Sequence, residues 1–380
     1  MNPRVAMLAH STLPRGGVVH AMNLSEALTA LGAETVLHAP DASGAGFFRE
    51  SLCETRAFPV APAPRNVADM VEARIAEYVA WLRRAENRGF DVYHAHDGLS
   101  GAALAQCRRE GVISGFVRTV HHIDAFADPR LDAWQAQSIA QADALMTVSE
   151  LWRRRLREDF GRDAVISGNG VDLAKFSPVL NGRERALRER WRLGDGPVFL
   201  AVGGVEARKN THAMLAAFDL LLGELPQARF VVAGGASLLD HGAYAQEFHA
   251  ALAAMGERAQ QVVVTGPLAD ADMPALYRLA DALVFASVKE GFGLCVLEAM
   301  ASGVPVVVSR LAPFTEYLDE AEALFCDPFD PASIASSMAA ALLDDGGRAR
   351  RLATAARHSW RAVTERTLAL YARLRSPAHA

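Results

Sequence analysis

Cysteine is scarce in this sequence. The 380 residues include four cysteines, none of them in a C-x-x-C pair: Cys53, Cys107, Cys295 and Cys326. A disulfide framework or a zinc knuckle needs closely spaced cysteines, so this spacing excludes both. We expect the protein to work in a reduced, cytoplasmic setting.

Long apolar runs are also missing. Near the N-terminus the apolar residues 5–9 are followed at once by His10, and that run is too short for the core of a secretory signal. No stretch approaches the roughly 20 apolar residues that a membrane-spanning helix requires. We therefore expect neither a secretory signal nor a membrane span.

Lysine is rare, and positive charge is not in excess. Lys and Arg together number 39, but lysine occurs only at Lys175, Lys209 and Lys289. Asp and Glu number 44, which gives a formal net charge of −5. Affinity for nucleic acid rests on neutralising phosphates, so this balance disfavours a dedicated nucleic-acid-binding protein.

The amino-acid composition is typical of a globular protein. Hydrophobic residues make up 51% and charged residues 22%, close to globular averages, which excludes a disordered or fibrous protein. A chain of 380 residues is too long for one ordinary hydrophobic core. We therefore expect two domains.

Short apolar runs alternate with amphipathic stretches of helical length. Continuous runs of Val, Ile and Leu indicate parallel strands buried on both faces, and strand–helix–strand repetition indicates open, doubly wound sheets. The predicted strands are 4–9, 34–39, 91–96, 115–120, 144–149, 197–204, 229–235, 261–266, 282–287, 305–309 and 323–327. The helix candidates include 18–31, 67–88, 131–142, 211–224, 270–280 and 330–343.

The two series of strands are separated by a linker. Asn169-Gly170 is a turn signal, and residues 176–182 carry Pro178 and Gly182. We predict an α/β protein of two Rossmann-like domains, 1–178 and 190–357, that face each other across a cleft, with a final helix over 358–376. A ligand would then bind at the carboxyl ends of the strands. The Gly- and Pro-rich stretch 40–66 is predicted to be a long surface loop.

The strongest chemical signal is VKEGFGLCVLEAMASGVPVVVS over 288–309. Gly291-Phe292-Gly293 is a flexible turn before a helix, whose free backbone N–H groups favour a phosphate. Glu290 stands just before the turn, where it can accept hydrogen bonds from sugar hydroxyls, and Glu298 lies about one turn into the helix, within reach of a ribose diol. The alternative is a surface turn followed by a core helix with Glu298 in solvent.

A second signal is AVGGVEARKNTHAMLAAF over 201–218. A buried strand ends in Gly203-Gly204, and Arg208 and Lys209 follow in the loop before a helix. Two cations beside a helix N-terminus suit a diphosphate, because Arg clamps oxygens bidentately and Lys acts as a point charge. An ordinary solvated loop is the alternative.

Two loops of the first domain carry weaker signals. Gly16-Gly17 precede an amphipathic helix, which lets that loop approach a ligand closely, although a plain strand–turn–helix joint explains it as well. His121 and His122 follow a predicted strand, with Asp124 near enough to orient one of them. The pattern does not decide between a functional histidine and an ordinary loop histidine.

Two further features favour ordinary explanations. Asp270 and Asp272 resemble a carboxylate pair that holds a metal beside a diphosphate, but no third ligand accompanies them, and acidic residues suit a helix N-terminus. We therefore predict no metal site. The Arg-rich stretch 150–160 can lie on an anionic membrane surface, but its acidic residues favour a solvated helix face.

Taken together, these segments resemble the retaining glycosyltransferases of family 4, which have the GT-B fold of two Rossmann-like domains. The resemblance covers nearly the whole chain. EGFGLCVLEAMASGVPVV is similar to the family's Glu–seven–Glu motif, VGGVEARKN looks like its phosphate-binding loop, and VSELWRRRL and ISGNGVDLAKFSP look like its connecting segments.

The resemblance implies a role for each matching residue. Glu290 would bind the donor-sugar hydroxyls, Glu298 the ribose, and Arg208 and Lys209 the diphosphate, while His121 would lie near the sugar unless the doubled histidine shifts that role to His122. Many relatives carry Arg where this chain has Gly204, so the clamp depends on Arg208. The final helix resembles the one that crosses back onto the first domain. The remaining donor-binding positions are Gly17, Gly204, Gly266, Leu268, Gly291, Phe292, Gly293 and Leu294.

The function that follows is sugar transfer from a nucleotide-diphosphate sugar to an acceptor hydroxyl, with retention and without a metal or a resident cofactor. A sugar-nucleotide epimerase on the same fold stays open as an alternative. A nicotinamide-dependent oxidoreductase would need a G-x-G-x-x-G fingerprint after the first strand, and no such match is visible. The donor base, the donor sugar, the acceptor and the oligomeric state are left open.

Overall fold

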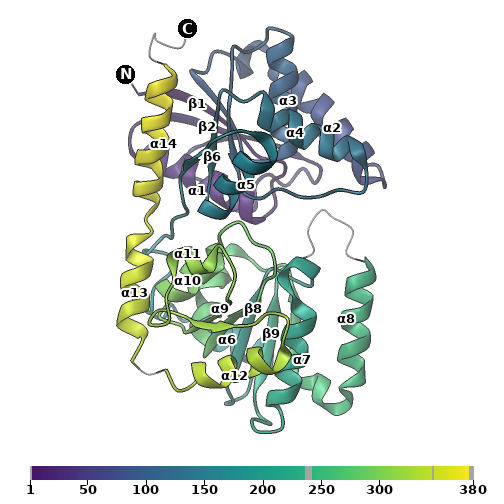
Figure 1. The fold of residues 1–380 in the computed structure, drawn as a ribbon, viewed down its shortest axis with the longest axis vertical. Helices are drawn as coiled ribbons and strands as arrows, with labels where there is room; N and C mark the ends of the chain where they lie inside the picture. Colours follow the sequence, from purple (N-terminus) through teal and green to yellow (C-terminus); the bar gives the residue numbers. More distant parts are fainter. Residues whose placement is uncertain (1, 236–241, 345, 376–380) are drawn as a thin grey trace. The chain divides into compact units, whose positions relative to one another are not determined.

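The computed structural model describes residues 2–235, 242–344 and 346–375 (Figure 1). The chain divides into two compact units. Unit 1 comprises Met1–Asn169 and Trp360–Ala380, and unit 2 comprises Gly170–Ser359. Each unit is built on a parallel sheet with helices on both faces, as the alternation of strands and helices predicts.

Unit 1 holds a parallel sheet that has seven strands among the described residues, in the order β3-β2-β1-β4-β5-β6-β7. The strands are β1 (Arg4–Leu8), β2 (Glu34–Asp41), β3 (Glu54–Pro59), β4 (Val92–Ala95), β5 (Val117–Val120), β6 (Ala144–Thr147) and β7 (Val165–Ile166).

The helices of unit 1 cover both faces of this sheet. They are α1 (Gly16–Ala30), α2 (Val67–Leu82), α3 (Gly98–Arg109), α4 (Pro129–Ala140), α5 (Glu150–Phe160) and α14 (Trp360–Leu374), with a 3-10 turn at Ala85–Asn87. Successive residues of β1 alternate between the faces. Ala6 and Leu8 join the core under α2 and α3, whereas Val5 and Met7 join the core under α1 and α14. Both sides of the strand are therefore apolar.

Helix α14 is distant in sequence from the rest of unit 1 but packs within it. It runs beside α1 (Figure 1), and the Tyr371 hydroxyl lies 2.6 Å from Nδ1 of His94 in the central strand β4. Arg366 donates to the carbonyl of Ser167 at 2.6 and 2.9 Å. Residue 376, the end of the predicted final helix, lies outside the described residues.

Unit 2 holds a second parallel sheet, with six strands among the residues described, in the order β10-β9-β8-β11-β12-β13. The strands are β8 (Val198–Val202), β9 (Arg229–Ala233), β10 (Val262–Gly266), β11 (Ala282–Phe285), β12 (Val306–Ser309) and β13 (Leu324–Cys326). The helices are α6 (Arg183–Arg190), α7 (Thr211–Leu221), α8 (Gly242–Ala254), α9 (Met273–Leu279), α10 (Leu294–Ala301), α11 (Phe314–Tyr317), α12 (Pro331–Ala341) and α13 (Arg348–Arg357). The 3-10 turns among its described residues are η2 (Ala207–Lys209), η3 (Gly256–Gln261) and η4 (Asp270–Asp272).

The strand order is the same in the two units. Numbered within its own unit, each sheet runs 3-2-1-4-5-6, the order of the Rossmann fold, and β7 extends the first. The order reverses between β1 and β4 in unit 1 and between β8 and β11 in unit 2. Ligands of doubly wound sheets bind outside the carboxyl ends of the strands at this reversal. The topology therefore marks one candidate site in each unit.

Several local predictions were wrong, including the end of the helix predicted over 67–88, which stops at Leu82, and the start of the second domain at 190, which α6 (Arg183–Arg190) precedes. Residues 40–66 are not all loop, because β3 forms there; it is an edge strand with exposed Glu54, and so it lacks a buried apolar run. Helix α1 begins at Gly16, two residues before its predicted start. Residues 170–178 group with unit 2, because Lys175 pairs with Asp270 and Phe176 packs on Tyr277.

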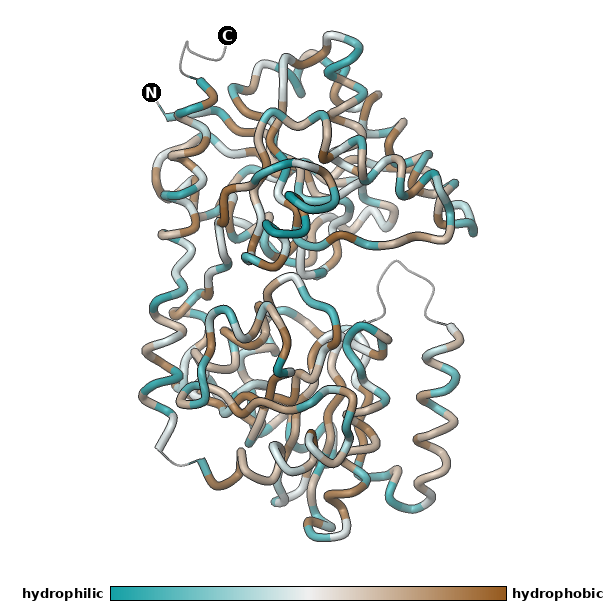
Figure 2. The backbone as a smooth tube through the Cα atoms, in the orientation of Figure 1, coloured by the Kyte–Doolittle hydropathy of each residue, from teal (hydrophilic) through white to brown (hydrophobic). Residues whose placement is uncertain are grey.

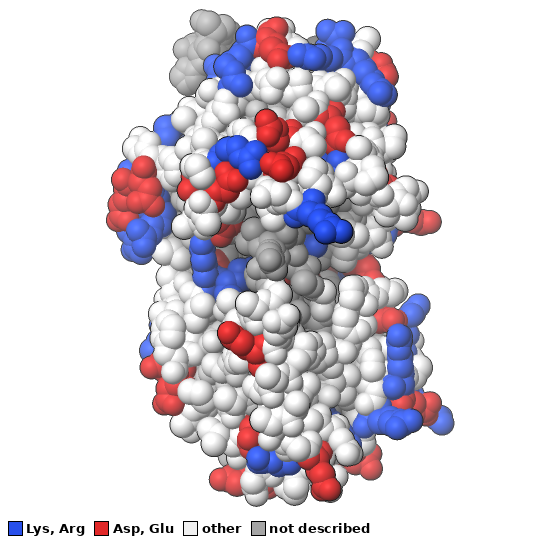
Figure 3. Space-filling model, turned by 90° about the vertical axis from the view of Figure 1, so that its right-hand side faces the viewer, with Lys and Arg blue, Asp and Glu red and all other residues white. Residues whose placement is uncertain are grey.

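Polarity follows this architecture. Figure 2 shows apolar segments along the strands of each unit and a hydrophilic α5. In α5, Arg153 and Arg157 each lie 2.9 Å from Asp163 Oδ1, which offsets their charge. On the face shown in Figure 3, Lys and Arg are interspersed with Asp and Glu. Within the described ranges, none of the helices combines the length and the apolar character needed to cross a membrane.

Candidate functional site

The loop after β8 begins with two glycines in the left-handed region. Gly203 has φ +124° and Gly204 has φ +77°. A Cβ on Gly203 would lie 2.7 Å from Cε of Lys209, and one on Gly204 would lie 2.7 Å from the carbonyl oxygen of Gly235. Glycine is therefore required here, because it lets the Lys209 side chain pass close to the backbone.

Two cations converge on one carboxylate oxygen at this edge of unit 2. Lys209 Nζ lies 2.6 Å and Arg208 Nη1 lies 2.7 Å from Oε1 of Glu290, which follows β11. The side chains of Lys209 and Glu290 are each 10% exposed, and Lys209 Nζ also sits 4.3 Å from the ring centroid of Phe285. The two elements at the reversal of strand order, β8 and β11, thus bring these three side chains together.

Hydrogen bonds to backbone carbonyls fix the two loops to each other. Asn210, itself at φ +61°, donates from Nδ2 to the carbonyl of Ala286 at 3.0 Å. The amide of Val288 donates to the carbonyl of Arg208, also at 3.0 Å. The positions of both cations are therefore set by the scaffold rather than by flexible loops.

The turn after Glu290 leads into helix α10. Gly293 caps the helix with φ +98°, and a Cβ there would lie 2.9 Å from Cε1 of Phe314. Phe292 is buried and stacks on Tyr317 at a centroid distance of 4.3 Å, and Tyr317 donates from its hydroxyl to the Phe292 carbonyl. Leu294 is the first residue of the helix, whose N-terminus favours an anion.

Glu298 lies one turn further along α10 in a partly buried position. The hydroxyl of Tyr277 donates to its Oε2 at 2.6 Å. Burial raises the pKa of Glu298, and the Tyr277 hydrogen bond and the charge of Lys175 oppose that rise. Lys175 is itself paired with Asp270 at 2.6 Å. Glu298 is thus oriented by a side chain outside its own helix.

The acidic pair at η4 is already engaged by cations. Asp270 pairs with Lys175 at 2.6 Å, and Asp272 pairs with Arg183 at 2.8 Å. The pair lies at a 3-10 turn that leads into α9, and this placement agrees with the helix-start interpretation. Gly266, with φ +67°, ends the neighbouring strand β10, and Leu268 follows it in a half-buried position.

In unit 1, His121 follows β5 and turns toward the start of α1. A Cβ on Gly17 would lie 3.6 Å from Cδ2 of His121. His122 points elsewhere: it is exposed, and its Nε2 lies 3.0 Å from Oδ2 of Asp124. Asp124 therefore orients His122 rather than His121. Burial lowers the pKa of His121 well below its ordinary value, so the ring is neutral at neutral pH.

Comparisons with known proteins agree with this geometry. The family model described as Glycosyltransferase Family 4 matches residues 14–175, and the one described as Glycosyl transferases group 1 matches residues 183–359. A D-inositol 3-phosphate glycosyltransferase of Xylanimonas cellulosilytica is 30% identical over 411 aligned positions, which cover 97% of this chain and 96% of that protein.

The chain belongs to glycosyltransferase family 4.

Other relatives and solved structures of this kind agree. O-antigen chain mannosyltransferase B of Escherichia coli is 28% identical over 67% of this chain and 69% of its own length. HepE of Anabaena, solved with UDP and glucose, has a TM-score of 0.78 at 16% identity over 98% of this chain and all of its own. Sucrose-phosphate synthase of Thermosynechococcus elongatus has the same TM-score at 21% identity, over 98% of this chain and 99% of that one. The fold is GT-B, and the protein is a glycosyltransferase; an epimerase is not favoured.

The family 4 motifs meet where the topology places a ligand. Arg208, Lys209 and Glu290 are in direct contact within unit 2. Glu298 belongs to the same unit but contacts Tyr277 instead. In unit 1, Gly17 and His121 are neighbours. The sequence thus selected two groups of residues that the fold brings together.

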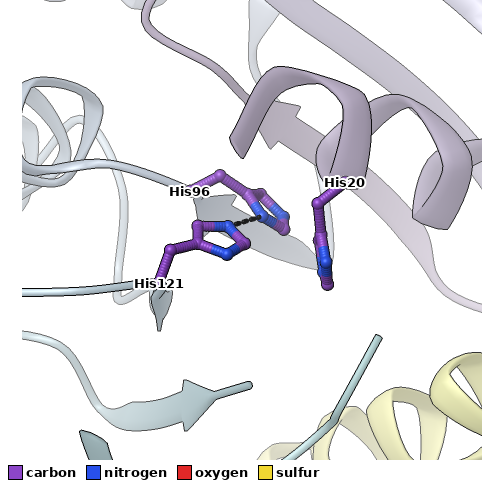
Figure 4. A group of neighbouring side chains, drawn as sticks. All are labelled: His20, His96 and His121. Carbon is purple, nitrogen blue, oxygen red and sulfur yellow. Dashed lines mark hydrogen bonds between the residues drawn. The ribbon is translucent and has the colours of Figure 1, made fainter. Parts of the chain in front are cut away.

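The sequence analysis did not identify four residues that lie next to the candidate site residues of this glycosyltransferase. Tyr277 and Lys175 shape the surroundings of Glu298, and His20 and His96 lie beside His121 (Figure 4). The rarity of lysine was a usable signal for Lys175. The two histidines at and after the end of β4, His94 and His96, were also a signal of a polar group at this sheet edge. Nothing in the local sequence pattern predicts that His20 of α1 lies beside them.

Proposed function

We propose that this family 4 enzyme is a retaining glycosyltransferase that moves a hexosyl group from a nucleotide-diphosphate sugar to an acceptor hydroxyl. The donor binds to unit 2, and Gly17 and His121 of unit 1 are residues of the sugar and acceptor side. Catalysis needs neither a metal ion nor a resident cofactor.

The observation that carries this proposal is the convergence of Arg208 and Lys209 on one oxygen of Glu290. Two cations that are held in place and point at one carboxylate oxygen can also bind the anionic oxygens of a ligand. A diphosphate presents such oxygens, and guanidinium and ammonium groups are the side chains that bind them best. The adjacent N-terminus of α10 adds its partial positive charge to the same site.

The same groups supply the main catalytic effect. When the anomeric C–O bond breaks, negative charge develops on the leaving diphosphate and the sugar becomes oxocarbenium-like. Once the donor is bound, Arg208, Lys209 and the backbone N–H groups at the start of α10 stabilise that charge. Among the described residues we see no carboxylate placed as a nucleophile, so the acceptor attacks from the face that the diphosphate leaves. A phosphate oxygen accepts the proton of the acceptor hydroxyl.

The carboxylates bind the neutral parts of the donor. When the donor binds, Arg208 and Lys209 pair with the diphosphate instead of Glu290, and the oxygens of Glu290 accept hydrogen bonds from the sugar hydroxyls. Glu298, held by Tyr277, accepts hydrogen bonds from the ribose diol. Gly204, Gly291, Phe292 and Gly293 let the backbone approach the diphosphate, and Gly266 and Leu268 contact the nucleobase.

Known relatives support a nucleotide-activated hexose as the donor class. The relatives that this chain resembles include inositol phosphate glycosyltransferases and mannosyltransferases, and fold neighbours were solved with UDP and glucose and with ADP. The ion pairs that engage Asp270 and Asp272 support a metal-free site, since cations of the chain already neutralise both carboxylates.

A ligand panel tests the proposal directly. The thermal unfolding of the full chain is measured with UDP-, GDP- and ADP-sugars, each with a mannose or glucose moiety. A donor at 100 times its dissociation constant stabilises the fold by about 2.7 kcal/mol. The Lys209→Ala variant is the matched control and should lose most of this stabilisation.

Turnover is then measured with the donor so identified. Release of nucleoside diphosphate should depend on an added hydroxyl acceptor, and NMR of the product should show the anomeric configuration of the donor. An inverted product would overturn retention, and release of an epimerised nucleotide sugar would overturn transfer.

A further inference from the structure

Glu206 is a buried acid beside the proposed diphosphate subsite of unit 2. It lies in the loop after β8, between Gly204 and the η2 turn that carries Arg208 and Lys209. Its side chain is 2% exposed, whereas that of Arg208 is 33% exposed. Glu206 therefore lies beneath Arg208, where a bound donor would not reach its carboxylate.

The backbone of Glu206 is held on both sides. Its amide donates to the hydroxyl of Thr211, at the start of α7, over 3.3 Å, and its carbonyl accepts from the amide of Lys209 at 3.1 Å. The Thr211 hydroxyl in turn donates to the carbonyl of Gly204 at 3.1 Å. None of these bonds uses an atom of the Glu206 carboxylate, so the loop does not need that charge to close.

Arg208 faces two carboxylates with different nitrogens. Its Nε lies 3.0 Å from Oε2 of Glu206, and its Nη1 lies 2.7 Å from Oε1 of Glu290. Glu206 belongs to the same loop as Arg208, whereas Glu290 belongs to the loop after β11. Arg208 can thus part from Glu290 without parting from Glu206, because the two contacts use different nitrogens.

The contact between Glu206 and Arg208 is one of charge. Oε2 of Glu206 is buried and accepts no well-aligned hydrogen bond from the part of the chain that the structure describes. A buried carboxylate is costly unless a cation compensates it. Arg208 supplies that cation, and the carboxylate holds the guanidinium in return.

We propose that Glu206 is a positioning residue, which keeps the guanidinium of Arg208 in place at the diphosphate subsite after Glu290 has released it to the donor. This inference rests on the proposed function, since it needs Arg208 to bind the donor diphosphate. An arginine side chain has several rotatable bonds, and a partner at Nε removes part of that freedom before the donor arrives. The guanidinium then meets the charge of the leaving diphosphate in a fixed geometry.

Removal of the charge of Glu206 should affect binding and turnover differently. Glu206→Gln keeps the shape of the side chain but takes one negative charge out of the subsite, so a nucleoside diphosphate should bind at least as tightly as it binds the parent chain. The guanidinium is then less well placed for the transition state. We expect kcat to fall about tenfold or more, since a displacement of about 1 Å can cost about a hundredfold. A merely structural role would weaken binding and turnover together.

The test uses the full chain, the donor that the ligand panel identifies and calorimetric titration of its nucleoside diphosphate. Glu322→Gln is the matched control, because Glu322 is 13% exposed and pairs with Arg357 elsewhere in unit 2, and this variant should keep the kcat of the parent chain. Glu206→Gln is also combined with Arg208→Ala and with Lys209→Ala. Its effect on kcat should vanish in the Arg208→Ala chain and persist in the Lys209→Ala chain, because Glu206 acts through Arg208.

Three outcomes overturn the role of Glu206: an unchanged kcat in Glu206→Gln, nucleoside diphosphate binding that weakens in step with kcat, or an undiminished effect of Glu206→Gln in the Arg208→Ala chain. The proposed function survives each of them as long as Arg208→Ala itself loses turnover. Nearly normal turnover in Arg208→Ala overturns the diphosphate assignment, and this inference with it.

A second variant covers the case in which Glu206→Gln does not melt cooperatively. Glu206→Asp withdraws the carboxylate from Arg208 by one methylene group and takes its place. It should lower kcat without weakening nucleoside diphosphate binding, and an unchanged kcat overturns the proposal.

Discussion

At the scale of single residues, we expect turnover to depend most on Arg208 and Lys209. Both contact one oxygen of Glu290, so each is positioned before any donor binds. Arg208→Ala and Lys209→Ala should each lower kcat about a hundredfold or more, because a preorganised donor to a developing anion is lost.

Steady-state kinetics of each variant check this prediction. Arg258→Ala is the matched control, since Arg258 is 54% exposed and pairs with Asp219 on the surface of the same unit. It should keep the kcat of the parent chain. Nearly normal turnover in both Arg208→Ala and Lys209→Ala would remove the diphosphate assignment.

Glu290 and Glu298 differ in the part of the donor that they are proposed to bind. Glu298→Ala should weaken binding of the sugar-free nucleoside diphosphate, which still carries the ribose. Glu290→Ala should leave that binding nearly intact and impair transfer, because its partner is the sugar. Calorimetric titration of the nucleoside diphosphate into both variants distinguishes them, and the reverse pattern would exchange the two roles.

Glu298 also carries a cost to stability that can be measured. Burial raises its pKa above the ordinary value of 4.5. An acid with a raised folded-state pKa favours folding below its unfolded pKa and loses that contribution as pH rises through the folded pKa. At neutral pH the ionised carboxylate is therefore destabilising, and Glu298→Gln should raise Tm at pH 7.

The comparison of two pH values makes this prediction specific. Glu298→Gln keeps an oxygen that can accept from Tyr277, which lies 2.6 Å away. Its advantage in Tm should shrink as the pH falls below 4.5, where the parent carboxyl is protonated in both states. An equal gain in Tm at both pH values would show that the charge of Glu298 is not its cause.

At the scale of elements, the turn that begins α10 depends on one glycine. Gly293 has φ +98°, and a Cβ there would lie 2.9 Å from the Phe314 ring. Gly256, in the same unit, has φ +61°, and a Cβ there would meet no atom within 4 Å. Both alanine variants incur the left-handed strain of about 1–2 kcal/mol, but only Gly293→Ala adds overpacking of about 1–3 kcal/mol.

Thermal melts of Gly293→Ala and Gly256→Ala therefore distinguish the cost of the left-handed backbone from the cost of the steric clash with Phe314. Gly293→Ala should lose clearly more in Tm, and it should also lose donor binding, because the α10 N-terminus shifts. Equal losses in the two variants would mean that the ring of Phe314 moves aside at no cost.

Elements were predicted well where a strand is buried on both faces. The apolar runs at 4–9 and 282–287 became the central strands β1 and β11. The edge strand β3 was missed, because exposed residues interrupt its apolar pattern. A strand that is buried on both faces has a continuous apolar sequence that can be recognised, whereas an edge strand has no such run.

The proximity of the candidate site residues was predictable where they lie in one motif. Glu290 and Gly293 stand close together in the chain, and Arg208 and Lys209 are adjacent. The contact between Tyr277 and Glu298 joins α9 to α10, and the approach of His20 to His121 joins α1 to the end of β5. Such contacts arise from the order of the strands in the sheet, which local sequence patterns do not predict.

At the scale of the whole molecule, one strand order serves two different chemistries. In unit 2 the reversal between β8 and β11 carries cations and carboxylates, and in unit 1 the reversal between β1 and β4 carries neutral histidines. We propose that unit 2 itself offsets the charge of the donor diphosphate.

This division predicts how transfer responds to metal removal. In the proposed mechanism Arg208, Lys209 and the start of α10 offset the charge of the leaving diphosphate, which would leave a magnesium ion no charge to neutralise. Donor turnover in excess EDTA should equal turnover without it. Asp272→Ala should be nearly silent, because Asp272 serves an ion pair with Arg183. Turnover that EDTA abolishes and magnesium or manganese restores would show that a metal, rather than the two cations, carries the charge of the leaving group.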